Sequence, residues 1–184
     1  MMILFSVSLF ASDAKPVHVL LHTELGDIEL ELDATHAPAT TANFLRYVDK
    51  GFYDGGAFYR TVTLDNQPQN HVKIEVIQGG NQPREKEDLP PVKLERTKDT
   101  GIKHLDGAVS MARDAPDTAT SEFFICVGAQ PELDYGGQRN PDGQGFAAFG
   151  HVVKGMDIVR KIQKSPAEGQ AITPPVKILS AKRL

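Results

Sequence analysis

Two polar side chains, Arg60 and Gln78, lie beside strand-like segments that are separated by a long polar stretch. Arg60 follows two aromatic residues in FYRTV, and Gln78 precedes two glycines in VIQGG. A guanidinium has a permanent charge and a planar fork of donors, and a nearby glutamine can orient it. If both side chains face one site, they would act on a substrate by positioning and hydrogen bonding.

Other catalytic constellations find little support. His18 and His22 are four positions apart, but they lie in a strand-like run where that spacing makes no helical metal site. The sequence has no G-x-S-x-G elbow and no P-loop, and Gly143-Gln144-Gly145 opens onto FAAFG rather than onto a helix. Cys126 lies in the apolar run FFICV, which favours a buried core cysteine over a reactive thiol. We therefore expect no metal and no cofactor.

Composition indicates an ordinary soluble domain. The chain has 184 residues, 40% of them hydrophobic and 24% charged, which predicts one domain with a sizeable core. The net charge of -4, with acidic and basic residues interspersed, predicts binding neither to nucleic acid nor to an anionic membrane surface. The single cysteine excludes an internal disulfide and a cysteine-based zinc cluster.

The N-terminal segment is read separately from the fold. Its apolar run MILFSVSLFA is too short to span a bilayer but suits a secretory signal peptide, with Ala11 or Ala14 as the cleavage residue. No Lys or Arg precedes the run, so an apolar N-terminal strand is the alternative. We assign 1–14 as a signal peptide or apolar N-terminal extension and 15–184 as the domain. A periplasmic or secreted protein is expected, with a cytoplasmic one as the alternative.

The rest of the chain alternates short strand-like runs with turn residues. A β-hairpin turning at Leu25-Gly26-Asp27 is predicted in VHVLLHTELGDIELELD. Thr40 or Thr41 would cap a helix that ends at Gly51, and GMDIVRKIQ predicts a second helix. Many short strands with two helices favour an antiparallel barrel whose ends are covered by the helices. The further strands are expected in AFYRTV, VKIEVI, GAVSMA, EFFICV, FAAFGHVV and PPVKILSAKRL.

Four long segments, 62–71, 81–103, 113–121 and 134–145, show no periodicity. Loops of this length on a compact barrel are usually functional or disordered. The segments RDAPDTATS and DYGGQRNPDGQG are rich in turn formers, which favours ordered turns. The charged segment NQPREKEDLPPVKLERTKDT is interpreted as a solvated surface loop.

The order of four motifs resembles the cyclophilins, the barrel-type peptidyl-prolyl isomerases. The motifs are FYRTV, VIQGG, DGAVSMARDAPDTATSEFFICVG and the LD that precedes GFAAFGHVVKGMDIVRKI. The resemblance extends from about Val17 to the C-terminus. It implies a mainly β fold, a closed eight-stranded antiparallel β-barrel capped by two α-helices. It also implies a monomer that accelerates rotation about X-Pro bonds in proline-containing polypeptides, assists protein folding and binds cyclosporin-type inhibitors with reduced affinity.

The resemblance assigns roles to nine residues. Arg60 matches the catalytic arginine, Gln78 the glutamine that orients it, and Phe124 the ring at the floor of the proline pocket. The implied substrate-binding residues are Val76, Ala112, Arg113, Glu122, Leu133 and Phe146.

Several positions depart from the family pattern. Glu75 stands where many members have the pocket phenylalanine, unless its side chain points away from the site. Many members have Asn at Arg113 and Gln at Glu122, and some have an aromatic residue at Glu132. These differences bear on substrate preference and inhibitor affinity more than on the fold.

The spacing of Arg60 and Gln78 is also longer than in the compact members, and the extra residues fall in TLDNQPQNH. We interpret this stretch as an elongated strand connection at the pocket rim. A second function stays open at this point, namely a proline-peptide binding module or holdase chaperone with little turnover.

Overall fold

The computed structural model describes residues 16–81 and 88–184. The predicted signal peptide or N-terminal extension, 1–14, lies outside the described residues, as does part of the charged segment after Asn81.

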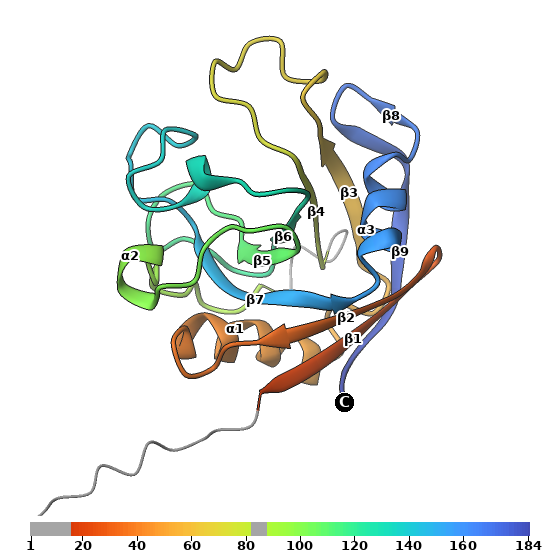
Figure 1. The fold of residues 1–184 in the computed structure, drawn as a ribbon. Coiled ribbons are helices and arrows are strands. Elements are labelled where there is room, and N and C mark those ends of the chain that lie inside the picture. Colours follow the sequence, from red (N-terminus) through yellow and green to blue (C-terminus); the bar gives the residue numbers. More distant parts are fainter. Residues whose placement is uncertain (1–15, 82–87) are drawn as a thin grey trace, which may run out of the picture.

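Eight antiparallel strands close into a barrel in the order β1-β2-β7-β5-β6-β4-β3-β9, and β9 pairs back with β1 (Figure 1). Closure leaves no exposed edge on this ring. The two-residue strand β8 (Ala167–Glu168) forms a hairpin with the start of β9. The mainly β barrel expected from the sequence is confirmed. The strands of the ring are β1 (Val17–Thr23), β2 (Gly26–Leu32), β3 (Ala57–Val62), β4 (Val76–Gly80), β5 (Ala108–Met111), β6 (Phe123–Cys126), β7 (Ala147–Lys154) and β9 (Ala171–Arg183).

Two helices cover the barrel, as predicted. Helix α1 (Pro38–Asp49) lies below it and helix α3 (Met156–Gln163) beside it in the view of Figure 1. The Phe44 ring of α1 lies 5.1–5.3 Å from the rings of Tyr53, Phe123 and Phe149, measured between centroids. The structure adds a four-residue helix, α2 (Thr97–Thr100), and the 3-10 turn η2 (Pro131–Leu133). Neither is long enough to leave a helical period in the sequence.

The N-terminus of α1 differs from the prediction. Its N-cap residue is Ala37, and Thr40 and Thr41 are buried inside the first turn rather than capping it. The carboxylate of Glu95 takes the capping role from a distant segment. It accepts hydrogen bonds from the backbone amides of Ala39 (3.1 Å) and Thr40 (2.8 Å) and from Thr40 Oγ1 (2.6 Å). A carboxylate suits this position because it satisfies orphan amides at the positive end of the helix dipole.

Two strand boundaries also differ. Thr23 pairs with Gly26, so the hairpin turns at Glu24 and Leu25, one residue earlier than predicted. The segment VKIEVI is a strand only from Val76 onward. The Gln67 side chain explains this, because its amide nitrogen donates to the Ile74 carbonyl (2.8 Å) and its oxygen accepts from the Ile74 amide (3.3 Å). A side chain thus occupies the backbone groups that a partner strand would have used.

Cys126 is buried within β6, and burial raises the pKa of its thiol well above the ordinary value, as expected for a core cysteine. Within residues 16–81 and 88–184, no helix has the length and apolar character needed to cross a membrane.

Candidate active site

A pocket of about 420 Å³ opens on the wall formed by β3, β4 and β6. All nine residues assigned from the sequence line it, so the fold brings together every predicted site residue. The pocket also has lining residues that the sequence did not single out, namely Tyr59, Ile74, Asp114, Thr118, Thr120, Arg139 and Asn140.

Arg60 and Gln78 are direct neighbours across β3 and β4, although they are 18 positions apart in the sequence. The antiparallel register pairs the two residues, and Arg60 Nη1 donates a 2.8 Å hydrogen bond to Gln78 Oε1. The long connection between the strands leaves the pairing of Arg60 with Gln78 intact, because it enters and leaves beyond Val62 and Val76. In Figure 1 it is the yellow segment that rises above the barrel.

A second glutamine, Gln170, holds the other side of the guanidinium. Its Oε1 accepts from Arg60 Nε (2.9 Å) and from Nη2 (2.7 Å). Gln170 is itself fixed, because its Nε2 donates to the Asn66 carbonyl (3.1 Å) and its carbonyl accepts from the Thr61 amide (2.9 Å). Sequence reasoning missed Gln170, which lies in the turn between β8 and β9, 110 positions from Arg60, with no periodic pattern to mark it.

The Gln78 amide continues the network to Tyr59 and Glu122. Gln78 Nε2 donates to the Tyr59 hydroxyl (2.7 Å), which donates to Glu122 Oε2 (2.5 Å). Partial burial, together with the Glu122 carboxylate, raises the pKa of Tyr59 above its ordinary value, so the hydroxyl stays protonated at neutral pH. With its nitrogen committed to Tyr59, the Gln78 side chain must turn its oxygen toward Arg60.

Gly80 makes room for this network. A β-carbon on Gly80 would lie 2.1 Å from Glu122 Oε1, far inside van der Waals contact. The absence of a side chain at Gly80 therefore leaves the space that the Glu122 carboxylate occupies beside Tyr59.

The floor of the pocket is apolar. Val76, Phe124 and Leu133 are buried in one cluster, and the ring of Phe146 meets that of Phe124 edge-on at 5.5 Å. Glu75 is not among the lining residues. Its carboxylate is 3.4 Å from Gln163 Nε2 on α3, and Ile74 supplies the apolar wall beside Val76. Glu75 therefore points away from the site, the alternative left open by the sequence.

Behind the floor lies a buried Ser-His-Asp arrangement. The His104 ring stacks on Phe124 with centroids 5.9 Å apart, and it lies 2.8 Å from Asp134 Oδ1 and 3.0 Å from Ser110 Oγ. Ser110 is fully buried, so no substrate can reach its hydroxyl and the arrangement serves to support Phe124. Partial burial of Asp134 acts to raise the pKa of its carboxyl, but hydrogen bonds from the His104 side chain and amide outweigh this and lower it.

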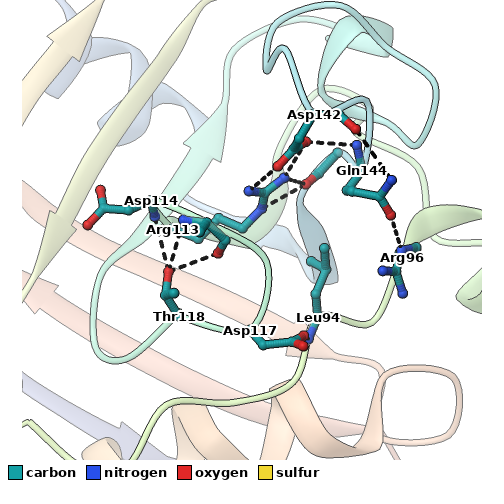
Figure 2. Close-up of polar contacts among 10 residues, drawn as sticks. Leu94, Arg96, Arg113, Asp114, Asp117, Thr118, Asp142 and Gln144 are labelled. Atoms are coloured by element: carbon teal, nitrogen blue, oxygen red, sulfur yellow. Dashed lines mark hydrogen bonds and ion pairs between the residues drawn. The ribbon is translucent and has the colours of Figure 1, made fainter.

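Arg113 fixes one rim of the pocket (Figure 2). Its guanidinium donates to both Asp142 carboxylate oxygens (2.8 and 3.0 Å) and twice to the Gly145 carbonyl (3.0 and 2.7 Å). It also lies 5.0 Å from the centroid of the Phe146 ring. The side chain is only 1% exposed, so Arg113 is placed to hold Phe146 and the 134–145 loop.

The loops around this rim are joined by further polar contacts, also drawn in Figure 2. The backbone amide of Gln144 donates to Asp142 Oδ1 (2.8 Å), and the side-chain oxygen Oε1 of Gln144 accepts from Arg96 Nε (2.6 Å). Asp117 Oδ1 accepts from the Leu94 amide (2.8 Å). The turns predicted at 113–121 and 134–145 are thus tied to each other through the segment that contains Leu94 and Arg96.

Comparison with known proteins identifies the family. Residues 18–183 match the family model described as cyclophilin type peptidyl-prolyl cis-trans isomerase/CLD. The chain belongs to the cyclophilin family.

Curated cyclophilins include relatives that match over most of their length. Peptidyl-prolyl cis-trans isomerase A of Dickeya dadantii is 40% identical over 174 residues, covering 90% of this chain and 83% of that protein. Peptidyl-prolyl cis-trans isomerase B of Escherichia coli is 35% identical over 155 residues, covering 83% and 87%.

A solved cyclophilin has the same fold at lower identity. The crystal structure of a cyclophilin type isomerase from Cryptosporidium parvum has a TM-score of 0.72 at 20% identity, covering 92% of this chain and 98% of that chain. A second structure of that protein, determined in the presence of the dipeptide Ala-Pro, has a TM-score of 0.70 and covers 90% and 97%.

Proposed function

We infer that this cyclophilin is a peptidyl-prolyl cis-trans isomerase that accelerates rotation about X-Pro bonds in polypeptides and so assists protein folding. The observation that carries the inference is the guanidinium of Arg60, fixed by two glutamines in the wall of an apolar pocket. The alternative, a binding module with little turnover, is not favoured by the family assignment or by this geometry.

The barrier to the reaction comes from conjugation in the amide. Rotation about an X-Pro bond faces roughly 18–20 kcal/mol, and exchange without a catalyst takes tens of seconds or longer. In the twisted transition state the prolyl nitrogen becomes pyramidal and gains a lone pair. A hydrogen bond donated to this lone pair is stronger in the transition state than in the ground state. That difference is the condition for catalysis.

Arg60 retains the donors for this task. A guanidinium has five N–H groups, and the contacts to Gln170 and Gln78 use one on each of its three nitrogens. One N–H on each terminal nitrogen is left for the substrate. Partial burial lowers the pKa of Arg60 from its ordinary value, but an arginine remains charged at neutral pH.

The apolar floor of the pocket provides the second half of the mechanism. We assign Val76, Phe124, Leu133 and Phe146 to hold the prolyl ring while the preceding carbonyl rotates. Enclosure of the ring also removes water from around Arg60, which strengthens the hydrogen bond to the prolyl nitrogen. The reaction makes and breaks no covalent bond, so these residues suffice for it.

The substrate class is a polypeptide that contains proline. The Cryptosporidium structure determined with Ala-Pro supports this assignment for the fold. We assign the Ala112 backbone to pair with the substrate chain beside the pocket.

The activity is tested by cis/trans exchange of an Ala-Pro peptide, followed by NMR line shapes or exchange spectroscopy, and by refolding of a protein limited by proline isomerisation. We expect both rates to rise in proportion to enzyme concentration. Exchange at the uncatalysed rate in both assays contradicts the function.

Export is a separate proposal. The apolar run MILFSVSLFA supports removal of 1–14 as a signal peptide and a periplasmic or secreted protein, with cytoplasmic retention as the alternative. Mass determination of the protein from its native host decides between them. An intact chain through Met1 contradicts export.

We further propose a monomer with reduced affinity for cyclosporin-type inhibitors. Arg113 and Glu122 replace residues that are common in the family, and Arg113 is committed to Asp142 and Gly145. Sedimentation that shows a stable dimer contradicts the first part. Inhibition as tight as that of a human cyclophilin contradicts the second.

A further inference from the structure

A second arginine, Arg139, lines the same pocket and has no role in the mechanism given above. It comes from the 134–145 loop, and its Nη1 donates to Gln67 Oε1 (2.9 Å) and to the Val72 carbonyl (2.7 Å) of the long β3–β4 connection. The 134–145 loop and the β3–β4 connection therefore meet at this side chain, at the edge of the proline pocket.

Arg139 forms no ion pair with any residue of 16–81 and 88–184, although Asp114 and Glu122 line the same pocket. Arg113 has the Asp142 carboxylate as a partner. Across residues 16–81 and 88–184, by contrast, no carboxylate lies within ion-pair distance of Arg139 or Arg60. Partial burial, and after it the positive charge of Arg60, lower the pKa of Arg139 from its ordinary value. Two like charges that share one pocket cost free energy, and an anion bound between them would offset that cost.

The register of β3 and β4 places this positive charge at one end of the pocket. Arg60 and Gln78 pair at the centre of the strands, and Glu122 contacts the Gly80 end. Arg139 bonds to Val72, eight residues before Gly80 along the same chain. Strand β4 alone, from Val76 to Gly80, rises about 3.3 Å per residue, so the Glu122 carboxylate at the Gly80 end lies away from the Val72 end. A peptide lying across the pocket meets the Glu122 carboxylate at one end, the Arg60 guanidinium at the centre and the Arg139 guanidinium toward the other end.

The hydrogen bonds to the β3–β4 connection leave other N–H donors of Arg139 available. The contacts to Gln67 and Val72 both involve Nη1. Nε and Nη2 make no hydrogen bond within the described part of the chain, so a bidentate fork is available to a planar anion.

We propose that Arg139, together with Arg60, binds a carboxylate on the substrate residue next to the proline, at the end of the pocket away from Glu122. The isomerase then prefers X-Pro segments flanked by Asp or Glu. The proposal rests on the proposed function, because it concerns the substrate of that same pocket.

The test uses matched peptides that differ only in charge. Two Ala-Pro peptides carry Asp or Asn directly after the proline, and two Pro peptides carry Asp or Asn directly before it. For the parent protein, we expect kcat/KM to favour Asp over Asn by about tenfold in one of the two positions at low salt, since charge-assisted bidentate contacts are strong. The preference should shrink as salt is raised.

Substitution of Arg139 then assigns the preference to this residue. In Arg139→Gln the Asp/Asn ratio should fall to about one, whereas Arg139→Lys should retain part of it. Arg160→Gln removes the same charge from the surface of α3 and should leave the ratio unchanged. A merely structural role for Arg139 would lower the rates for Asp and Asn peptides alike and leave their ratio intact.

The outcomes are distinguishable. Turnover of the Asn peptides with an Asp/Asn ratio near one in both positions overturns the proposal and leaves the isomerase function standing. A ratio that persists in Arg139→Gln also overturns it. If the parent protein fails to turn over any of the four peptides, the proposed function fails, and this inference fails with it.

Discussion

Arg60 is useful as a catalyst only while its guanidinium is fixed, and most of the polar residues around it serve that end. Gln170 and Gln78 bind it from two sides, and Tyr59 sets the direction of the Gln78 amide. A donor fixed before the substrate arrives loses little entropy in the transition state, which is how such groups lower barriers.

Gln170 gives a prediction at the residue scale. In Gln170→Ala, Arg60 loses two hydrogen bonds of about 1 kcal/mol each, so we expect kcat to fall by up to about 30-fold with KM little changed. Gln170→Glu should restore part of kcat, because a carboxylate accepts from the same two donors but cannot donate to the Asn66 carbonyl. The measurement is peptide exchange over a range of substrate concentrations, together with the thermal midpoint.

Gln138→Ala, at an exposed glutamine of the 134–145 loop, is the matched control and should behave like the parent protein. If KM rises while kcat is unchanged in Gln170→Ala, the residue contacts substrate and does not position Arg60.

The residues found by sequence differ in kind from those that were missed. Arg60, Gln78 and Phe124 lie in short motifs inside strands. These motifs carry the resemblance to the cyclophilins, and the alternation of a strand fixes the direction of each side chain. Gln170 and Arg139 lie in turns, where the backbone has no period and only the folded chain shows what a side chain meets.

At the scale of elements, the long β3–β4 connection is ordered by its own side chains. Gln67 binds the backbone of Ile74, and Asn66 Oδ1 accepts from the Thr63 amide while its Nδ2 donates to the Thr61 carbonyl. These bonds explain why VKIEVI alternates like a strand and yet becomes one only at Val76. A pattern of apolar residues reports burial, but it cannot report which backbone groups a distant side chain has already taken.

Glu95 gives a prediction for helix α1. Glu95→Ala removes the acceptor for two helix amides and a hydroxyl, so we expect a loss of about 1–2 kcal/mol in the free energy of unfolding. Urea unfolding measures this loss. Peptide exchange below the transition should be unaffected, because α1 does not line the pocket.

Glu168→Ala, at an exposed carboxylate, is the control and should cost little. Equal stability of Glu95→Ala and the parent protein contradicts the capping role. The sequence offered Thr40 and Thr41 as caps because those residues are typical N-caps, and Glu95, 55 residues away, left no local signal.

At the scale of the whole molecule, the same buried contacts of His104 stabilise both the barrel and the floor of the pocket. The buried His104 ring carries Phe124 on one face and is held by Asp134, which belongs to the loop that also carries Arg139 and Phe146. Loss of the Asp134 contact therefore affects both the stability of the fold and the floor of the site.

The lowered pKa of Asp134 predicts how stability depends on pH. Its folded pKa lies below the unfolded value of about 3.9, so its contribution is fully present above that value and is lost as pH falls through the folded pKa. Asp134→Asn should therefore show a smaller drop in the free energy of unfolding between pH 6 and pH 2 than the parent protein. Urea unfolding across that range checks it, with Asp65→Asn at an exposed loop position as the control. An unchanged pH profile in Asp134→Asn contradicts the linkage.

The central claim is that Arg60 lowers the barrier to X-Pro rotation by donating to the prolyl nitrogen. The most direct test compares kcat/KM for exchange of an Ala-Pro peptide in the parent protein, in Arg60→Ala and in Arg60→Lys, after confirming that all three are folded. We predict that Arg60→Ala loses on the order of 10²-fold, as for removal of other preorganised donors, and that Arg60→Lys recovers little because an ammonium lacks the planar fork. Equal rates in the parent protein and Arg60→Ala would contradict the account.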